Sequence, residues 1–346
     1  MQTYLGKSKS DDKIFIDSKS PNKSVFVTGI SGSGKTSRMF QIELEAVLQD
    51  GIVVILDLNH THDEEQILPQ IRSKYTSLIN RIDPVSEGVN LNLFEPRCTP
   101  DGTVEPYVNL VNSAVNALRG NHRMGERQLC ALRRAVETAI QIRHRCADDA
   151  AALIYALAQQ NSPEADAVYG KLWTLLNCGA LKGGGKSLMK HQLNVVDLSN
   201  MDFITAGNFA EIFLSVLWRN IQCGKSEFIE QGMLLSIDEF QRLSLKNDGS
   251  LLHMLREGRK FSLSLLLATQ TLEVFPKEIL AILNQTASQL YFRPNQNEIT
   301  KIAKKIAPED QKTWQQILGN LRVGESVAVG DFNVGGHTVR RPILTI

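Results

Sequence analysis

One eight-residue segment of this 346-residue chain, Gly29-Ile-Ser-Gly-Ser-Gly-Lys-Thr36, has the residue types that bind phosphate. It matches the pattern G-x-x-x-x-G-K-[ST], in which glycines let backbone N–H groups turn inward around an anion. Lys35 would place a charge on the β- and γ-phosphates, and the Thr36 hydroxyl suits Mg²⁺. The alternative is a chance glycine-rich turn, but an apolar run precedes the motif and a helical pattern follows it. The residues expected to bind the nucleotide are Gly29, Ser31, Gly32, Ser33, Gly34, Lys35, Thr36 and Ser37.

A second chemical signal is the pair of acids Asp238 and Glu239, which directly follow the apolar run 233–237. In a hydrolase with a phosphate-binding loop, Asp238 fits the role of holding Mg²⁺ and Glu239 that of polarising the attacking water. The alternative is two solvated loop acids. Asp57 ends another apolar run, but no second acid adjoins it, and we rank it lower.

A polar amide, Gln270, stands just after the apolar run 262–268. At the end of a strand such an amide can lie close to the γ-phosphate and act as a sensor, a residue whose contacts change when the γ-phosphate is hydrolysed. The alternative is an ordinary amide at a strand end.

The elements that must position these residues alternate between strand and helix. Short β-branched and apolar runs predict strands, and the longer amphipathic stretches between them predict helices. This alternation predicts an α/β fold with a mostly parallel sheet. The expected strands are 13–20, 24–28, 52–58, 193–198, 233–237, 262–268 and 289–293, with 90–94 an edge strand or loop. The expected helices are 37–49, 64–80, 206–222, 248–258, 276–287 and 296–305.

Residues 105–180 interrupt the alternation, because they contain no strand-like run. Four helices are expected there, at 105–119, 125–146, 147–160 and 163–177. We therefore expect an all-helical insertion, and a division into residues 1–104, 105–190 and 191–346. The glycine-rich segment 183–187 lacks a preceding strand and is expected to be a turn. The C-terminus predicts a β-hairpin that turns at Val334-Gly335-Gly336.

Composition excludes several classes of protein. There are 38 Lys plus Arg and 37 Asp plus Glu, so the net charge of +1 excludes a polybasic DNA binder. No apolar run approaches the roughly 18 residues that span a bilayer, and no signal peptide is present, so a cytoplasmic protein is expected. Five scattered cysteines without a CxxC pair, and His60 with His62, do not predict a metal site.

Four segments taken together resemble the HerA/FtsK superfamily of P-loop ATPases. They are GISGSGKT, LLSIDEF, LREGRKFSLSLLLATQ and VGESVAVGDF, in this order. The closest resemblance is to the HerA branch and to the ATPases of conjugation and type IV secretion, and it covers about residues 13–345.

The resemblance implies a RecA-like sheet, assembled into a ring that is commonly a hexamer, with ATP and Mg²⁺ between subunits. It assigns Lys35 and Thr36 to the P-loop, Asp238 and Glu239 to the metal and the water, and Gln270 to the sensor. An arginine from the neighbouring subunit would stabilise the transition state. Arg256 and Arg259, in LREGRK, lie in the segment expected to supply it, and Arg293 is the rival.

Arginines concentrate in residues 117–145, which hold seven Arg and two Glu. On one helix, Arg119, Arg123 and Arg127 would share a face and grip phosphates without reading sequence. The alternative is a solvated face or a subunit interface.

The leading expectation is a ring ATPase that translocates double-stranded DNA in DNA processing, conjugative transfer or defence, with a partner such as a nuclease or a secretion component. The other readings are an ATPase that energises secretion or assembly of protein, and a nucleotide-dependent scaffold for a nuclease.

Overall fold

The chain is built around one large sheet, which has nine strands among the described residues. The structure is a computed structural model, and it describes residues 2–20, 23–89, 91–99, 101–120, 122–182, 185–224, 232–243, 245 and 249–346. The strand order of the sheet is β13-β10-β9-β3-β8-β7-β4-β6-β5. The strands from β9 to β5 run parallel, and β10 and β13 are antiparallel additions at one edge. The strands are β3 Ser24–Thr28, β4 Ile52–Asp57, β5 Ile79–Ile82, β6 Leu193–Asp197, β7 Met233–Ile237, β8 Leu263–Thr269, β9 Ala287–Tyr291, β10 Ser326–Val329 and β13 Ile343–Thr345.

The central strands are continuous apolar runs because helices cover both faces of the sheet. Val25 and Val27 pack into one hydrophobic cluster, whereas Phe26 packs into the other, as the two-residue period of a strand requires. Helices α1 (Lys35–Leu48) and α2 (Arg72–Thr76) lie on the first face. Helices α7 (Phe203–Gln222), α9 (Ser250–Glu257) and α10 (Lys277–Thr286) lie on the second face. The mostly parallel α/β sheet is therefore confirmed.

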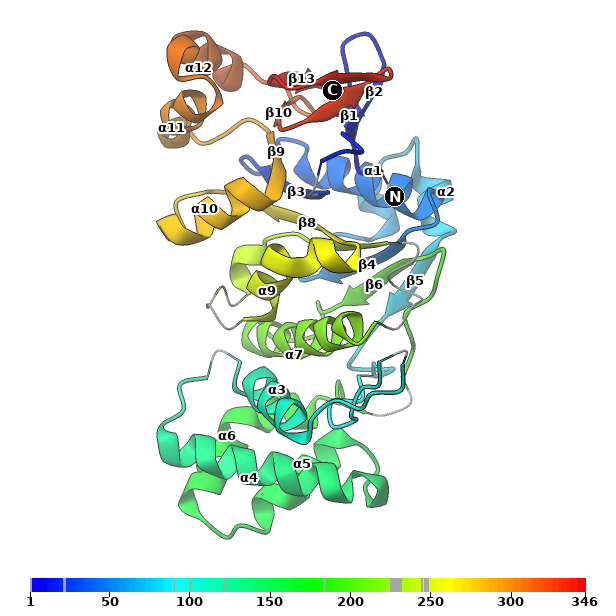
Figure 1. Cartoon of the computed structure of the whole chain (residues 1–346), viewed down its shortest axis with the longest axis vertical. Helices are drawn as coiled ribbons and strands as arrows, with labels where there is room; N and C mark the ends of the chain where they lie inside the picture. The colour runs from blue at the N-terminus through cyan, green and yellow to red at the C-terminus, as the bar shows by residue number, and fades with distance from the viewer. Residues whose placement is uncertain are drawn as a thin grey trace.

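Two further helices, α11 (Gln296–Ile306) and α12 (Gln311–Gly319), form a separate cluster over the edge strands β9 and β10. Tyr291 and Val327 from the strands are buried there against Ile302 and Leu318. Helix α12 was not expected from the sequence. The pair lies at one end of the molecule, beside β10 and β13 (Figure 1).

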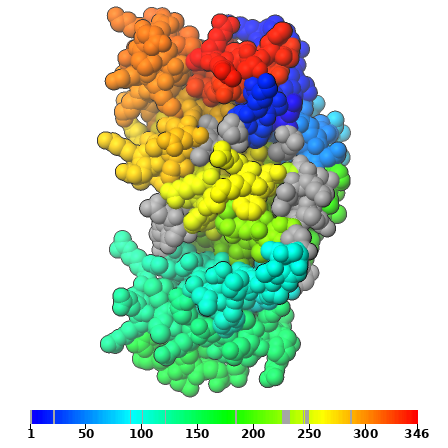
Figure 2. Space-filling model, in the orientation of Figure 1, coloured from blue at the N-terminus to red at the C-terminus, as the bar shows by residue number. Residues whose placement is uncertain are grey.

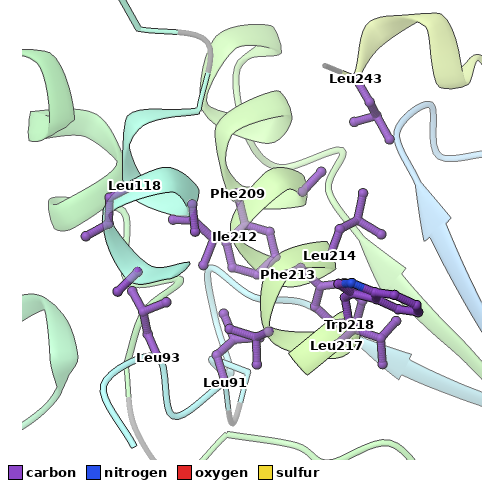
Figure 3. Packing of buried hydrophobic residues seen from close by; sticks show 14 of the residues in the cluster. Leu91, Leu93, Leu118, Phe209, Ile212, Phe213, Leu214, Leu217, Trp218 and Leu243 are labelled. Carbon is purple, nitrogen blue, oxygen red and sulfur yellow. The ribbon is translucent and has the colours of Figure 1, made fainter. Parts of the chain in front are cut away.

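The all-helical insertion lies between β5 and β6. It consists of α3 (Tyr107–Arg119), α4 (Glu126–Ile142), α5 (Asp149–Ala158) and α6 (Pro163–Asn177), and it forms the opposite end of the molecule from α12 (Figures 1 and 2). Leu118 of α3 and Phe209, Ile212 and Phe213 of α7 belong to one cluster that runs on into α4, α5 and α6 (Figure 3). The insertion thus shares a continuous core with the sheet.

A small antiparallel sheet, in the order β1-β2-β11-β12, joins the two termini. It pairs β1 (Tyr4–Lys7) and β2 (Lys13–Ile16) with the expected terminal hairpin, β11 (Phe332–Val334) and β12 (His337–Val339). The hairpin turns at Gly335-Gly336, where both glycines have positive φ, and is confirmed. Strand β1 was not expected.

The prediction of one helix over 64–80 is wrong. Only α2 is α-helical in that range, and Ile79–Ile82 forms the edge strand β5 instead. Pairing with β6 satisfies the backbone of this segment and buries Asn80 and Ile82, so tertiary contacts override a weak helical pattern. Residues 90, 183, 184 and 248 of other predicted segments lie outside the described residues. Within the described part of the chain, no helix is long and apolar enough to cross a membrane.

Candidate functional site

The predicted phosphate loop connects the fully buried strand β3 to the first turn of α1. Gly34 precedes the helix with φ near +101°, a conformation that a side chain strains. A Cβ there would also lie 2.7 Å from the backbone nitrogen of Gly324. The N–H of Gly324 in turn donates to the carbonyl of Ser33 at 2.9 Å. Glycine is therefore required at position 34 both by the turn and by this close approach.

Lys35 lies inside the curve of the loop and is only 6% exposed. Its ammonium group donates to the carbonyls of Gly29 at 2.7 Å and Ile30 at 3.0 Å. Burial lowers the pKa of Lys35, and the charges of Asp238 and Glu239 oppose that shift. A cation is thus held where the loop and the positive end of α1 both favour an anion.

Asp238 faces the first turn of α1 from the end of β7. The Thr36 hydroxyl lies 3.4 Å from the Asp238 Oδ2. Burial and the nearby charge of Glu239 raise the pKa of Asp238, and Lys35 acts in the opposite direction. A hydroxyl and a carboxylate that face each other are the hard oxygen ligands that Mg²⁺ prefers, so these residues fit the predicted metal site.

Glu239 follows Asp238 with its backbone in the left-handed conformation, with φ 53° and ψ 42°. Its Oε1 accepts a hydrogen bond from the Gln270 amide at 2.7 Å, and its other oxygen accepts one from Gln241. The two adjacent acids therefore face different partners, Thr36 and Gln270. The structure brings together five residues that the sequence singled out from three separate segments: Lys35, Thr36, Asp238, Glu239 and Gln270.

A cavity of about 540 Å³ opens beside the loop. Ser31, Gly32 and Ser33 line it from the loop, with Arg293 and the segment 319–323 opposite. Arg293, the alternative candidate for the arginine supplied by a neighbouring subunit, thus lies against the loop of its own chain. The lining residue Arg322 was not expected from the sequence, because only the fold returns this distant segment to the loop.

Glu43, which the sequence did not single out, is a fully buried residue of α1, the helix that follows the loop. It accepts hydrogen bonds from the hydroxyls of Ser236 and Tyr75, both at 2.5 Å, and its Oε2 lies 3.3 Å from His62 Nε2. The only sequence signal was an acid among apolar residues of α1.

Asp57 closes the same cluster, since its Oδ2 lies 3.1 Å from His62 Nδ1 and accepts the His62 backbone N–H at 2.9 Å. Burial would lower the pKa of His62, but Glu43 and Asp57 outweigh it and raise the pKa to about 10. Asp57 therefore supports the loop after β4 rather than facing the phosphate loop.

His60 lies apart from His62, between Asp63 at 2.7 Å and Asp197 at 3.1 Å. In the part of the chain that the structure describes, no group of three or more His, Cys, Asp or Glu residues is arranged to hold a metal. The five cysteines are free thiols.

Arg256 and Arg259 are exposed and precede β8, at the edge of the sheet opposite the phosphate loop. Thr28, which leads into the loop, is in register with Thr269 at the far end of β8. A strand of seven residues is about 20 Å long, so neither arginine can reach the loop of its own chain.

The prediction that Arg119, Arg123 and Arg127 share one helix face is wrong. Arg119 is the last residue of α3, because Gly120 follows with φ 46°, and α4 begins only at Glu126. Arg123 lies in the connection and Arg127 in the first turn of α4, and both are exposed. Arg119 is half-buried instead, and its Nε is buried without a hydrogen-bond partner among the described residues.

The fold of this chain is similar to that of solved structures. No family model matches the sequence, and no curated protein matches it. The structure of VirB4 of Thermoanaerobacter pseudethanolicus is similar over 99% of this chain and 95% of that chain, with 17% identity and a TM-score of 0.71. The plasmid coupling protein TrwB in complex with ADP and Mg²⁺ is similar over 93% of this chain and 84% of that chain, with 14% identity and a TM-score of 0.60. The likeness confirms the RecA-like fold with its helical insertion, as the HerA/FtsK resemblance implied.

Proposed function

We propose that this chain is an ATP-hydrolysing motor of the HerA/FtsK type. The observation that carries the proposal is the meeting of the Thr36–Asp238 pair with the Glu239–Gln270 pair beside the phosphate loop. The loop N–H groups and Lys35 bind and orient the phosphates. Glu239 takes a proton from the attacking water, and Gln270 holds the Glu239 carboxylate in place. Thr36 and Asp238 would hold Mg²⁺, which neutralises charge on the phosphates when bound.

The ring is the second part of the proposal. Arg256 and Arg259 lie before β8, at the opposite edge of the sheet from the loop of their own chain, so a nucleotide phosphate in contact with them would belong to another copy. A homo-oligomer, most simply the hexamer that the resemblance implies, would complete the site with one of these arginines. Residues 1–104 and 191–346 would form the motor domain, and residues 105–190 a helical insertion for partner or substrate.

We propose double-stranded DNA as the substrate, bound without sequence preference, in DNA processing, conjugative transfer or defence with a partner protein. TrwB, which has the same fold, is described as a bacterial conjugative coupling protein. The alternative is an ATPase that energises secretion or assembly of protein. The break between α3 and α4 favours this alternative, because it removes the continuous row of arginines expected to grip DNA.

Turnover of ATP with and without duplex DNA tests the proposal. Hydrolysis that needs Mg²⁺, is lost in Lys35→Ala and rises with DNA is the expected result. Hydrolysis that duplex DNA of any length leaves unchanged would favour the secretion or assembly ATPase. Absence of hydrolysis despite ATP binding would favour a scaffold, against which the pair Asp238–Glu239 argues.

A further inference from the structure

The segment that follows Gln270 is held by a buried acid from a distant helix. Glu298 lies in the first turn of α11 and is 1% exposed. Its Oε1 accepts the Thr271 hydroxyl at 2.7 Å and the Leu272 backbone N–H at 2.6 Å. Two donors on consecutive residues thus converge on one carboxylate oxygen, directly beyond the predicted sensor.

Gln270 contacts the site through its side-chain amide. Its side chain is exposed, and it donates to Glu239 Oε1 at 2.7 Å. Behind it, Thr269 and Thr271 are linked by a hydrogen bond of 3.1 Å between the Thr269 hydroxyl and the Thr271 carbonyl. A shift of the segment 271–272 would therefore move the Gln270 amide relative to Glu239.

The chain that follows this helical pair also contacts the phosphate loop. Helix α11 is anchored by Ile302 in the cluster with α12, and the chain runs from α12 through the segment 319–324 to the Gly324–Ser33 hydrogen bond at 2.9 Å. Helix α11 therefore contacts the segment behind the sensor, and the chain leaving α12 contacts the loop.

We propose that Glu298 is a positioning residue for hydrolysis: it fixes the end of β8 so that Gln270 holds the Glu239 carboxylate in its working orientation. The inference rests on the proposed ATPase function. A displacement of about 1 Å in a catalytic group can cost about 100-fold in rate. Loss of Glu298 should therefore lower kcat and leave KM for ATP nearly unchanged, since none of the loop groups that bind phosphate contacts it.

The experiment compares Glu298→Ala, Glu298→Gln and Gln315→Ala in steady-state ATP turnover. In Glu298→Ala we expect kcat to fall about 10- to 100-fold, with KM for ATP within about threefold of wild type. Glu298→Gln keeps an amide oxygen for both donors and should retain most of kcat. Gln315→Ala is the matched control, because it removes only an exposed 3.0 Å bond to Thr300 between α11 and α12. A kcat for folded Glu298→Ala equal to that of Gln315→Ala would overturn the proposal.

A double-variant cycle separates positioning from general loss of structure. If Glu298 acts through Gln270, Glu298→Ala should cost nothing further in a Gln270→Ala background. Equal, additive losses in both backgrounds would show that Glu298 acts elsewhere and would overturn the proposal. Thr271→Val, which removes one of the two donors, replaces Glu298→Ala if that variant does not fold, and should show a smaller loss of kcat.

A third measurement does not depend on turnover. Amide hydrogen exchange in the segment 269–273 should become faster in Glu298→Ala and stay slow in Glu298→Gln and Gln315→Ala. Unchanged exchange in Glu298→Ala would overturn the proposal even if the wild-type chain hydrolyses ATP. Conversely, faster exchange in a chain whose wild-type form hydrolyses no ATP would leave the contact in place and refute the proposed function.

Discussion

The Ser236 hydroxyl donates a 2.5 Å hydrogen bond to the Glu43 carboxylate. This contact joins the same two segments as the contact between Thr36 and Asp238. Ser236 lies in β7 and Asp238 directly follows that strand, and both side chains contact α1. Thr36 and Glu43 are seven residues apart, two turns of α1, and share one side of that helix. The two pairs therefore form successive contacts across one helix–strand interface, and the buried pair helps to set the distance at the predicted metal site.

Removal of the Glu43 carboxylate should destabilise the fold. Glu43→Ala leaves His62 buried beside a cavity and leaves two buried hydroxyls without their acceptor. We expect the free energy of unfolding in urea to fall by about 3–5 kcal/mol, the range for breaking a buried ion pair. Ser236→Ala, which removes one hydrogen bond to a charged group, should cost about 1.5–3 kcal/mol. Equal stability of Glu43→Ala and wild type would show that the cluster contributes nothing.

The same cluster predicts a dependence of stability on pH. Its titratable groups are His62, Glu43, Asp57 and Tyr75, and the pKa of His62 is raised from 6.5 to about 10. The folded state holds this proton more tightly, so the stabilisation is complete below about pH 6.5 and is lost as pH rises toward 10. Urea unfolding between pH 6 and 10 should show a steeper loss for wild type than for His62→Gln, and parallel curves would contradict the ion pair.

The chemistry of the site is tested by two substitutions with different expected outcomes. Lys35→Ala removes the buried cation and should abolish ATP turnover. Glu239→Gln keeps the shape and the contact with Gln270 but removes the base, so ATP should still bind while hydrolysis is lost. Binding of a fluorescent ATP analogue and release of phosphate measure the two steps separately. Wild-type turnover in Glu239→Gln would mean that another group is the base.

Completion of the site by a neighbouring subunit is tested by mixing two inactive variants. Lys35→Ala retains its arginines, whereas Arg256→Ala/Arg259→Ala retains its phosphate loop. Each should be nearly inactive alone, and a mixture should recover part of the activity where an intact loop meets an intact arginine. A trans arginine can be worth about three to five orders of magnitude in rate, so a few complete sites suffice.

A mixed-label pulldown must show that the subunits exchange. No recovery despite verified exchange, together with full activity of a monomeric fraction, would show that each chain works alone.

The revised placement of the arginines changes the test of DNA binding. Arg123→Ala/Arg127→Ala removes two exposed charges near the start of α4 and should weaken duplex binding equally for all sequences, with a shallower dependence on salt. Arg119→Ala is the comparison, because that side chain is half-buried and its loss should lower stability more than affinity. Fluorescence anisotropy at several salt concentrations measures the slopes, and an unchanged slope in the double variant would exclude these residues from DNA contact.

The sequence by itself determined the parts of the site that are local in the chain. The loop from Gly29 to Thr36, the acids after β7 and the amide after β8 each sit at the end of a buried apolar run. Parallel strands bring their carboxyl ends to one edge, so the meeting of Thr36 with Asp238 and of Glu239 with Gln270 followed from the fold class.

Only the tertiary structure decided the contacts that depend on packing between distant segments. Glu43 contacts Ser236, 193 residues away in the sequence, and Glu298 contacts Thr271, 27 residues away. These contacts form because helices pack on the sheet in a register that no local pattern specifies. A local pattern was also overruled: residues 64–80 were expected to be one helix, but Ile79–Ile82 pairs with β6 as an edge strand. The free energy that decides these cases comes from burial and hydrogen bonding between elements, which is not written in the spacing of residues within one element.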